Sequence, residues 1–312
     1  MHIETREKDG SKKYYLAQSF RDGRSVKKVR VFLGRDLTEE ALKERAKKAE
    51  TELQKRVEEA KVIRDPFLTV LSPVELKELK TLEARGELHV RHLSEADWTK
   101  FKETFTCNTN AIEGSRINAS EVQNILENQG WPQDKSKEDI AETLGVAEAV
   151  DYIRTVDEHV SLELIKKLHN IVFKNSKSFA GVFHPKGVEV VVADVYGVVV
   201  HRGAPSQQIE GLLNEIVHWY NQNKTKCQPM VLAAVVHNQF EVVNPFQDGN
   251  GRVGRLLLNN ILLKHDLPPL NIELKNRTQY YLALQAYEKE NNIRPMLELM
   301  LKEYKALKQL LK

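Results

Sequence analysis

A glycine- and asparagine-rich loop between two apolar helices constrains this chain more than any other feature. The loop, residues 244–255, reads Asn-Pro-Phe-Gln-Asp-Gly-Asn-Gly-Arg-Val-Gly-Arg. Residues 231–243 before it and the leucine-rich residues 256–263 after it both have apolar residues at helical spacing. The loop is therefore expected at a helix N-terminus, where free backbone N–H groups and the positive end of the helix dipole attract anions.

The side chains of this loop have the chemistry of a nucleotide phosphate site. Its glycines let the backbone approach a phosphate closely, and Arg252 and Arg255 can offer planar guanidinium forks to the outer oxygens. Asp248 can hold a Mg²⁺ ion that neutralises a polyphosphate. A plain polar turn before a helix is the alternative, but the close spacing of these groups favours the phosphate site.

The loop resembles the signature of the Fic family, His-x-Phe-x-Asp/Glu-Gly-Asn-Gly-Arg-x-x-Arg, whose members mostly transfer AMP from ATP to a protein hydroxyl. The resemblance covers roughly residues 100–300 and implies a mainly α fold, a Fic-type helical core with a β-hairpin flap. It also implies that Asp248 binds Mg²⁺ and that Arg252 and Arg255 hold the β- and γ-phosphates of ATP. The backbone groups that would cradle the phosphates belong to Gly249, Asn250 and Gly251.

Asn244 stands where the family signature has its catalytic histidine. An imidazole can accept a proton near neutral pH and a carboxamide cannot, and the loss of a general base typically costs about 10²–10⁴-fold in rate. Two explanations stay open: a naturally degenerate relative, or an enzyme whose histidine was replaced to silence it. The otherwise intact loop favours the second explanation.

The segment Thr109-Asn110-Ala111-Ile112-Glu113-Gly114 resembles the inhibitory motif of the family, Ser/Thr-x-x-x-Glu-Gly/Asn. In such relatives the glutamate pairs with the second signature arginine, which is Arg255 here. A carboxylate in that guanidinium fork would displace the γ-phosphate and repel the triphosphate. In some relatives the same glutamate activates a water and removes AMP, so Glu113 could also serve as a base. An ordinary helix surface is the alternative for this segment.

Two further segments fit the resemblance. Residues 187–201 are rich in β-branched residues with turn-forming residues in the middle, which indicates a hairpin. This hairpin resembles the Fic flap, on which a segment of the target protein docks by strand addition; a plain edge hairpin is the alternative. Tyr280 and Tyr281 match by spacing the paired tyrosines that family members place near the adenosine. Phe246 and His237 are expected to pack inward as core residues.

By sequence the chain divides into a small α+β N-terminal extension, residues 1–65, a linker and inhibitory-helix region, residues 66–135, and a catalytic core, residues 136–312. In the extension, residues 12–34 are predicted to form a hairpin with its turn at Asp22-Gly23, followed by a charged helix. The hairpin is basic, so a nucleic-acid patch and a target-binding or dimerising module are both alternatives. A solvated hairpin that supports the helix is favoured. Its aromatic and basic residues include Tyr14, Tyr15, Lys27, Lys28 and Arg30.

Composition narrows the expected function classes. Charged residues make up 29% of the 312 residues with a formal net charge of +3, so we expect no nucleic-acid partner and no membrane surface. Cys107 and Cys227 match no metal spacing and indicate reduced thiols. Without a membrane-length apolar run or a signal peptide, a cytoplasmic protein is expected.

The sequence thus predicts a protein adenylyltransferase that uses Mg²⁺ and ATP to modify a Ser, Thr or Tyr hydroxyl of a target protein. Glu113 would restrain the enzyme, and Asn244 would strongly impair it. The alternatives are an ATP-binding regulatory module without catalysis, and a Glu113-dependent removal of AMP from a modified protein. A homodimer is suggested by relatives alone, and ATP itself rests on the resemblance, because the loop is expected to contact phosphates and not the base.

Overall fold

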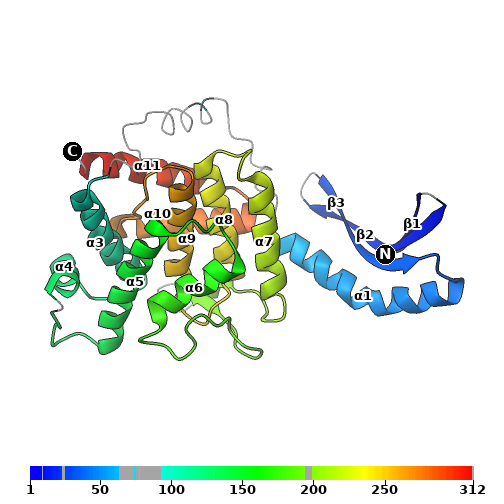
Figure 1. The fold of residues 1–312 in the computed structure, drawn as a ribbon, viewed down its shortest axis with the longest axis horizontal. Helices are drawn as coiled ribbons and strands as arrows, with labels where there is room; N and C mark the ends of the chain where they lie inside the picture. The colour runs from blue at the N-terminus through cyan, green and yellow to red at the C-terminus, as the bar shows by residue number, and fades with distance from the viewer. Residues whose placement is uncertain are drawn as a thin grey trace. The chain divides into compact units, whose positions relative to one another are not determined.

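The structure is a computed structural model that describes residues 1–8, 10–22, 25–62, 93–128, 130–193 and 199–310, together with 74 and 77. The chain divides into two compact units, Met1–Leu68 and Thr69–Lys312 (Figure 1). The linker with Pro66 and Pro73 that the sequence predicts lies outside the described residues. None of the helices in the described ranges combines the length and the apolarity needed to span a bilayer.

The N-terminal unit is a three-stranded antiparallel sheet with one helix. The strands β1 (His2–Lys8), β2 (Ser11–Asp22) and β3 (Ser25–Arg35) lie in the order β1-β2-β3, and the helix α1 spans Glu39–Val62. The sequence predicts the β2–β3 hairpin and the helix, but it does not predict β1. Ile3 is the one large apolar residue within β1, so this edge strand has no alternating pattern to indicate it.

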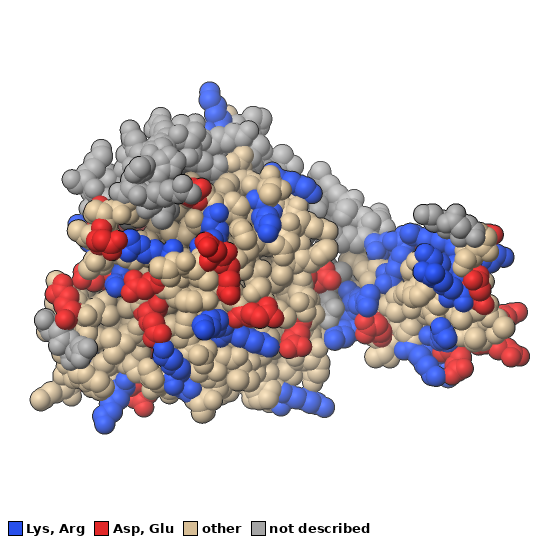
Figure 2. Space-filling view, viewed as in Figure 1, with Lys and Arg blue, Asp and Glu red and all other residues tan. Residues whose placement is uncertain are grey.

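One face of this sheet packs against α1. Leu16 of β2, Leu33 of β3 and Leu53 of α1 are at most 5% exposed and form the centre of a small core. The apolar stripe of the otherwise charged helix therefore covers the sheet, as its spacing predicts. Lysine and arginine side chains gather over the strands of this unit (Figure 2).

The second unit is almost entirely helical, which confirms the mainly α fold with a small hairpin. Its helices α8 and α9 lie at the centre of the bundle (Figure 1), and nearly all of their residues are buried. Burial on every side, in place of one apolar stripe, is typical of helices at the centre of a core. In chain order, the elements are α3 (Glu95–Ile112), α4 (Ala119–Asn128), α5 (Lys137–Thr155), α6 (Leu162–Phe173), β4 (Val191–Ala193), β5 (Val199–Arg202), α7 (Ile209–Asn223), α8 (Pro229–Val243), α9 (Asn250–Lys264), the 3₁₀ turn Leu274–Asn276, α10 (Arg277–Glu290) and α11 (Arg294–Leu310).

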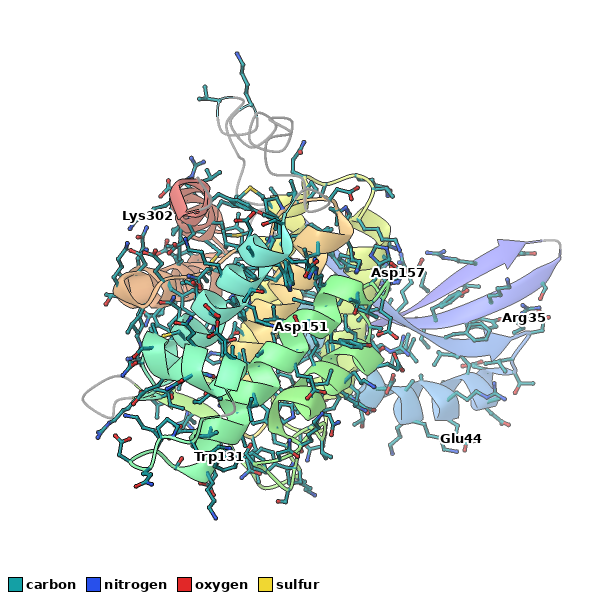
Figure 3. The ribbon with its side chains drawn as sticks, turned by 60° about the vertical axis from the view of Figure 1, so that its left-hand side comes forward. Arg35, Glu44, Trp131, Asp151, Asp157 and Lys302 are labelled. Carbon is teal, nitrogen blue, oxygen red and sulfur yellow. The ribbon has the colours of Figure 1, made fainter. Side chains whose placement is uncertain are left out.

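Helix α3 is fixed against α5 at its N-terminal half. The indole of Trp98 donates to the Asp151 carboxylate at 3.2 Å, and Lys102 donates to its second oxygen at 2.8 Å. Figure 3 shows Asp151 in the body of this unit. Because Trp98 and Phe101 are also almost completely buried, the far end of α3, which carries the second motif, has a defined position.

The predicted hairpin is confirmed over the residues that the structure describes. Strands β4 and β5 pair antiparallel, with Val191 opposite Arg202 and Val192 opposite His201. Residues 194–198 of the predicted hairpin lie outside the described residues.

Close packing of α5 on α6 depends on Gly145, because a Cβ there would overlap the backbone carbonyl of Val172. We expect Gly145→Ala to lower the free energy of unfolding of the helical unit by about 1–3 kcal/mol, the usual cost of overpacking. Gly130→Ala is the control: the nearest atom to its added Cβ is 3.5 Å away, and a change within about 0.5 kcal/mol is expected. Urea unfolding followed by circular dichroism measures both, and equal midpoints for the two variants would contradict the assigned packing.

Candidate active site

The loop between α8 and α9 is held by two residues with left-handed backbone. Asn244 follows α8 with a φ of 51°, and its N–H donates to the Phe240 carbonyl at 2.9 Å. Asparagine tolerates this conformation better than most residues do. Gly249 precedes α9 with a φ of 79°, and a Cβ there would overlap the ring of Phe173. The chain therefore turns sharply twice. Helix α9 begins at Asn250, inside the segment 244–255 that the sequence predicts as a loop and before the leucine-rich run.

Phe246 and two polar side chains fix the inside of the loop. Phe246 is fully buried, as expected, and its ring stacks on His169 with 3.8 Å between centroids. The side-chain amide of Asn250 accepts from the Phe246 N–H at 2.8 Å and donates to the Phe246 carbonyl at 2.7 Å. His169 Nδ1 accepts from the Gly181 N–H at 2.8 Å, so its Nε2 donates to the Asp248 carbonyl at 3.1 Å.

The first turn of α9 provides the anion-binding groups. Its first N–H groups have no acceptor within the helix, and they lie at the positive end of the helix dipole. Asp248, just before this turn, has a half-exposed carboxylate. One of its oxygens lies 3.7 Å from Arg252 Nη2 and the other 3.5 Å from Lys177 Nζ. The sequence singled out Asp248 and Arg252, whereas Lys177 comes from a distant segment and carries no local signal.

Arg252 lies in the first turn of α9, and its guanidinium is already paired. Its Nη1 donates to Glu142 Oε2 of α5 at 2.5 Å, and its Cζ lies 4.5 Å from the ring centroid of Phe173. Glu142 also lies 3.5 Å from Lys177, so the two cations share this carboxylate. Glu142 was not predicted, because it is 110 residues away from Arg252 in the chain.

Arg255 is the most completely enclosed of the charged groups at this site. Its side chain is 2% exposed. Its Nε donates to the Thr109 hydroxyl at 2.7 Å, and its Nη2 donates to the Thr109 carbonyl at 3.1 Å and to Glu113 Oε1 at 2.6 Å. The two motifs that the sequence singled out therefore meet in one contact. Gly114, with a φ of 99°, turns the chain away directly after Glu113.

Gly251 makes room for this contact, since a Cβ at that position would overlap Glu113 Oε1. The end of α3 also favours a cation. The negative end of its helix dipole lies there, and the Thr109 carbonyl accepts from the guanidinium. The carboxylate of Glu113 thus accepts from one N–H group of the Arg255 guanidinium, beside the first turn of α9.

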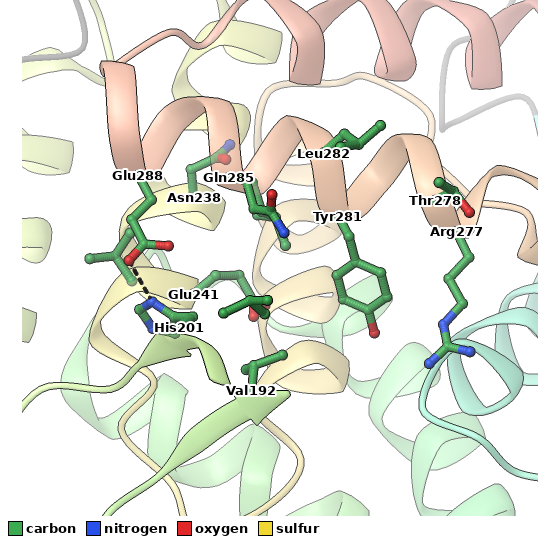
Figure 4. Close-up of a pocket in the computed structure, with 13 residues that line it drawn as sticks. Val192, His201, Asn238, Glu241, Arg277, Thr278, Tyr281, Leu282, Gln285 and Glu288 are labelled. Atoms are coloured by element: carbon green, nitrogen blue, oxygen red, sulfur yellow. Dashed lines mark hydrogen bonds and ion pairs between the residues drawn. The ribbon is translucent and has the colours of Figure 1, made fainter. Parts of the chain in front are cut away.

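The paired tyrosines have different positions. Tyr280 is buried behind Arg255, whose Nη1 donates to its hydroxyl at 3.3 Å, and the same hydroxyl lies 2.9 Å from Nε2 of the core residue His237. Tyr281 lines a pocket of about 370 Å³ between the flap, α8 and α10 (Figure 4). Of the pair, only Tyr281 is placed where a bound molecule could touch it. The apolar wall of the pocket includes Val192, Val200, Leu282 and Leu284.

Several residues that line this pocket have a polar atom without a hydrogen-bond partner within the described part of the chain. Glu241 of α8 is mostly buried, with 15% of its side chain exposed. Its Oε1 has no hydrogen bond there, and burial raises its pKa to about 8. His201 of the flap holds Glu288 of α10 through Nδ1 at 2.8 Å, while its Nε2 has no partner (Figure 4). The sequence offered a signal for Glu241 that was missed, namely a carboxylate in a helix whose other residues are apolar or uncharged.

The geometry defines a helical domain with a phosphate-type loop at a helix N-terminus and a pocket under a hairpin flap. The chain belongs to the Fic/DOC family, whose family model matches residues 159–262. Among curated relatives, the protein adenylyltransferase fic-1 of Caenorhabditis briggsae is 30% identical over 237 residues, which are 72% of this chain and 45% of that protein. The protein adenylyltransferase Fic of Aedes aegypti is 30% identical over 59% of this chain and 36% of its own length.

Solved structures share the fold. A Fic-domain signaling protein from Bacteroides thetaiotaomicron matches with a TM-score of 0.66 and 21% identity, over 76% of this chain and 95% of that chain. Fic-1 from Caenorhabditis elegans (residues 134–508) matches with a TM-score of 0.63 and 22% identity, over 88% of this chain and 78% of that one. The chain spans less than half the length of the curated relatives named above.

Burial of His169, the α6 histidine that contacts the loop, predicts a loss of stability in acid. Burial lowers the pKa of His169 from 6.5 to about 4, so between these values the unfolded chain binds more protons than the folded one. The contribution of His169 to the free energy of unfolding is fully present above pH 6.5. It falls by about 3 kcal/mol as the pH is lowered toward 4. Urea unfolding near neutral pH and near pH 4.5 should show a smaller acid loss for His169→Gln than for the unchanged protein. Equal acid losses in the two proteins would contradict this role of His169.

Proposed function

We propose that this protein is an adenylyltransferase that transfers AMP from Mg-ATP to a Ser, Thr or Tyr hydroxyl of a target protein. The observation that carries this proposal is the start of α9, where Asp248 directly precedes the helix N-terminus and Arg252 and Arg255 follow within its first turns. This end of the helix therefore carries the groups that suit a polyphosphate. The names of the curated relatives support the same reaction, since they are protein adenylyltransferases.

The neighbouring pocket suits the nucleoside. Its volume of about 370 Å³ and its apolar walls would enclose a base, and Tyr281 offers a ring face at one side. Glu241 and His201 supply the few polar groups that such a pocket needs to orient a bound nucleoside. The phosphates would then extend toward Arg255 and over the first turn of α9. Tyr280, which we first expected beside the adenosine, would act indirectly by positioning Arg255.

Asp248 fits the Mg²⁺ ion that the family implies. Its carboxylate is half exposed at the mouth of the loop, and one carboxylate together with substrate phosphates is a common way to hold Mg²⁺. The ion would neutralise phosphate charge as the pyrophosphate leaves. Lys177 and Arg252 flank the same carboxylate, so each can contribute positive charge to the phosphates.

Glu113 would restrain the reaction. As long as its carboxylate accepts from Arg255, this guanidinium has one donor fewer for a γ-phosphate, and the negative charge repels the triphosphate. The end of α3 would have to move, or the Glu113 side chain would have to rotate away, before ATP binds productively.

Asn244 is the reason to expect little activity from the chain as it stands. Its carboxamide lies where the family has an imidazole, and it cannot accept a proton from the target hydroxyl. A transferase without its base keeps the phosphate site and loses about 10²–10⁴-fold in rate.

The target segment would bind to the flap, residues 187–201. Strands β4 and β5 form a two-stranded sheet, and an extended peptide can add a strand to such an edge. The free thiols of Cys107 and Cys227 fit a reducing compartment, so we place the reaction in the cytoplasm. A homodimer, as in relatives, stays a prediction.

The second candidate function is an ATP-binding regulatory module without catalysis, and it rests on Asn244. This residue suits the left-handed position after α8, so it needs no histidine to keep the loop folded. Removal of AMP from a modified protein is a third candidate. It rests on Glu113, whose carboxylate lies beside Gly251 at the phosphate loop, where it could activate a water.

Transfer of label from α-labelled ATP to protein tests the proposal. We compare Glu113→Gly with the double variant Glu113→Gly/Asn244→His, in the presence of Mg²⁺. The double variant is expected to label protein at least about 10²-fold faster, because it regains the general base. Adding Asp248→Asn to the double variant is the control and should abolish the label, since it removes the carboxylate for Mg²⁺.

The outcomes separate the three candidate functions. Label that appears in the double variant and not with Asp248→Asn supports the transferase. Nucleotide binding without label in any variant supports the regulatory module. Loss of AMP from a modified protein, prevented by Glu113→Gly, supports the reverse reaction.

A further inference from the structure

The face of the N-terminal sheet that points away from α1 has no role in AMP transfer. Side chains alternate across a strand, so the register assigns residues to the two faces. Leu16 pairs with Val31, and both pack toward α1. Tyr15 pairs with Phe32, so these two rings lie together on the opposite face, which we call the open face. The other open-face residues with described contacts are Glu4, Arg6, Lys28 and Arg30.

We propose that the open face binds single-stranded nucleic acid, with bases stacked on Tyr15 and Phe32 and phosphates held by the surrounding cations. This site belongs to the N-terminal unit and is independent of the proposed adenylyltransferase activity.

The two rings form an aromatic platform. Their centroids are 5.3 Å apart with an interplanar angle of 54°, and Phe32 is 52% exposed. A single exposed phenylalanine is common on protein surfaces. Here, however, it lies beside a second ring in a strand register that fixes both. Stacking of a base on such a ring is insensitive to sequence, because every base has a π face.

The cations around this platform are held in place by one carboxylate. Glu4 accepts from Arg30 at 2.9 Å, from Lys28 at 2.8 Å and from Arg6 at 3.1 Å. These partners, Arg30 and Lys28 foremost, lower the pKa of Glu4 to about 2. Arg6 also lies 5.5 Å from the centroid of the Tyr15 ring. Three cations share one anion, so the cluster keeps a net positive charge while its side chains are oriented on one face.

The surrounding sequence strengthens the positive potential. Residues 1–36 contain ten lysines and arginines against five acidic residues, and Figure 2 shows the resulting concentration of lysine and arginine over the strands. The net charge of +3 for the whole chain hides this local excess. That average was the basis for expecting no nucleic-acid partner, and the present proposal departs from that expectation.

The rings favour a single strand over other polyanions. Bases in a duplex are stacked on each other and offer no face to an aromatic side chain, whereas unpaired bases do. An acidic peptide could neutralise Lys28 and Arg30 but would leave the Phe32 ring without a partner. Cations beside exposed rings match the two parts of a nucleotide, a phosphate and an aromatic base.

Fluorescence anisotropy with the full chain tests this proposal. The probes are a labelled DNA strand, an RNA strand of the same sequence, and the corresponding DNA duplex, each titrated at several salt concentrations. We expect the single strands to bind more tightly than the duplex. The logarithm of the affinity should fall with that of the salt concentration, with a slope of about −0.7 for each phosphate contact. The RNA and DNA probes decide which nucleic acid is preferred, and either preference supports the site.

Four variants identify the surface. Phe32→Ala should weaken binding roughly tenfold, and Phe32→Tyr should restore it, because a ring is again available for stacking. Lys28→Gln should weaken binding and reduce the salt slope by about 0.7. Glu4→Gln should strengthen binding, since it removes the anion that competes with phosphate. Lys48→Gln is the charge-matched control on α1, where Lys48 pairs with Glu44, and it should leave binding unchanged.

The result that would overturn the proposal is equally specific. Either no binding of single strands at low salt, or tighter binding of the duplex, contradicts stacking on the open face. The same holds if Phe32→Ala and Lys28→Gln bind as tightly as the unchanged chain. Circular dichroism confirms that each variant is folded. In the Glu113→Gly/Asn244→His background, label transfer from ATP should be unaffected by all of them, so failure here leaves the adenylyltransferase proposal standing.

Discussion

The buried guanidinium of Arg255 joins three helices, and the organisation of the active site depends on it. Arg255 comes from α9, its acceptors Thr109 and Glu113 come from the end of α3, and Tyr280 of α10 lies behind it. A cation that is almost completely desolvated must be neutralised or fully hydrogen-bonded. In this protein the neutralising carboxylate belongs to the segment that would have to leave when a triphosphate arrives. Under the proposed function, this one interaction would couple the occupancy of the phosphate site to the position of α3.

The glycines of the signature loop serve this coupling as well as the phosphate. Gly251 leaves the space that Glu113 occupies, and Gly254 leaves space for the buried carboxylate of Glu241. The carboxylates of Glu113 and Glu241 thus approach the first turns of α9 at two positions where any side chain larger than that of glycine would exclude them. The same small residues let the α9 backbone approach a phosphate closely. If α9 binds a phosphate as proposed, the same small residues serve both the phosphate and the protein carboxylates seen here.

Features that depend on local sequence could be predicted, and those that depend on distant contacts could not. The loop at the start of α9, the buried Phe246 and the meeting of Glu113 with Arg255 follow from short motifs. Glu142 and Lys177 pair with loop residues through the tertiary fold alone, so nothing near them in the chain indicates their role. Strand β1 lacks an alternating pattern because Ile3 is its one large apolar residue. Spacing alone could not separate buried Tyr280 from Tyr281 in the pocket.

Calorimetric titration of Mg-ATP tests most directly the claim that Glu113 occupies the phosphate ligand Arg255. The unchanged protein is compared with Glu113→Gly and with Glu113→Gln, which keeps the side-chain size but removes the charge. A charge-assisted hydrogen bond is worth about 1.5–3 kcal/mol, so both variants should bind ATP about tenfold more tightly or better. Equal affinities in all three proteins would contradict the account, because the Glu113–Arg255 contact would then impose no cost on nucleotide binding.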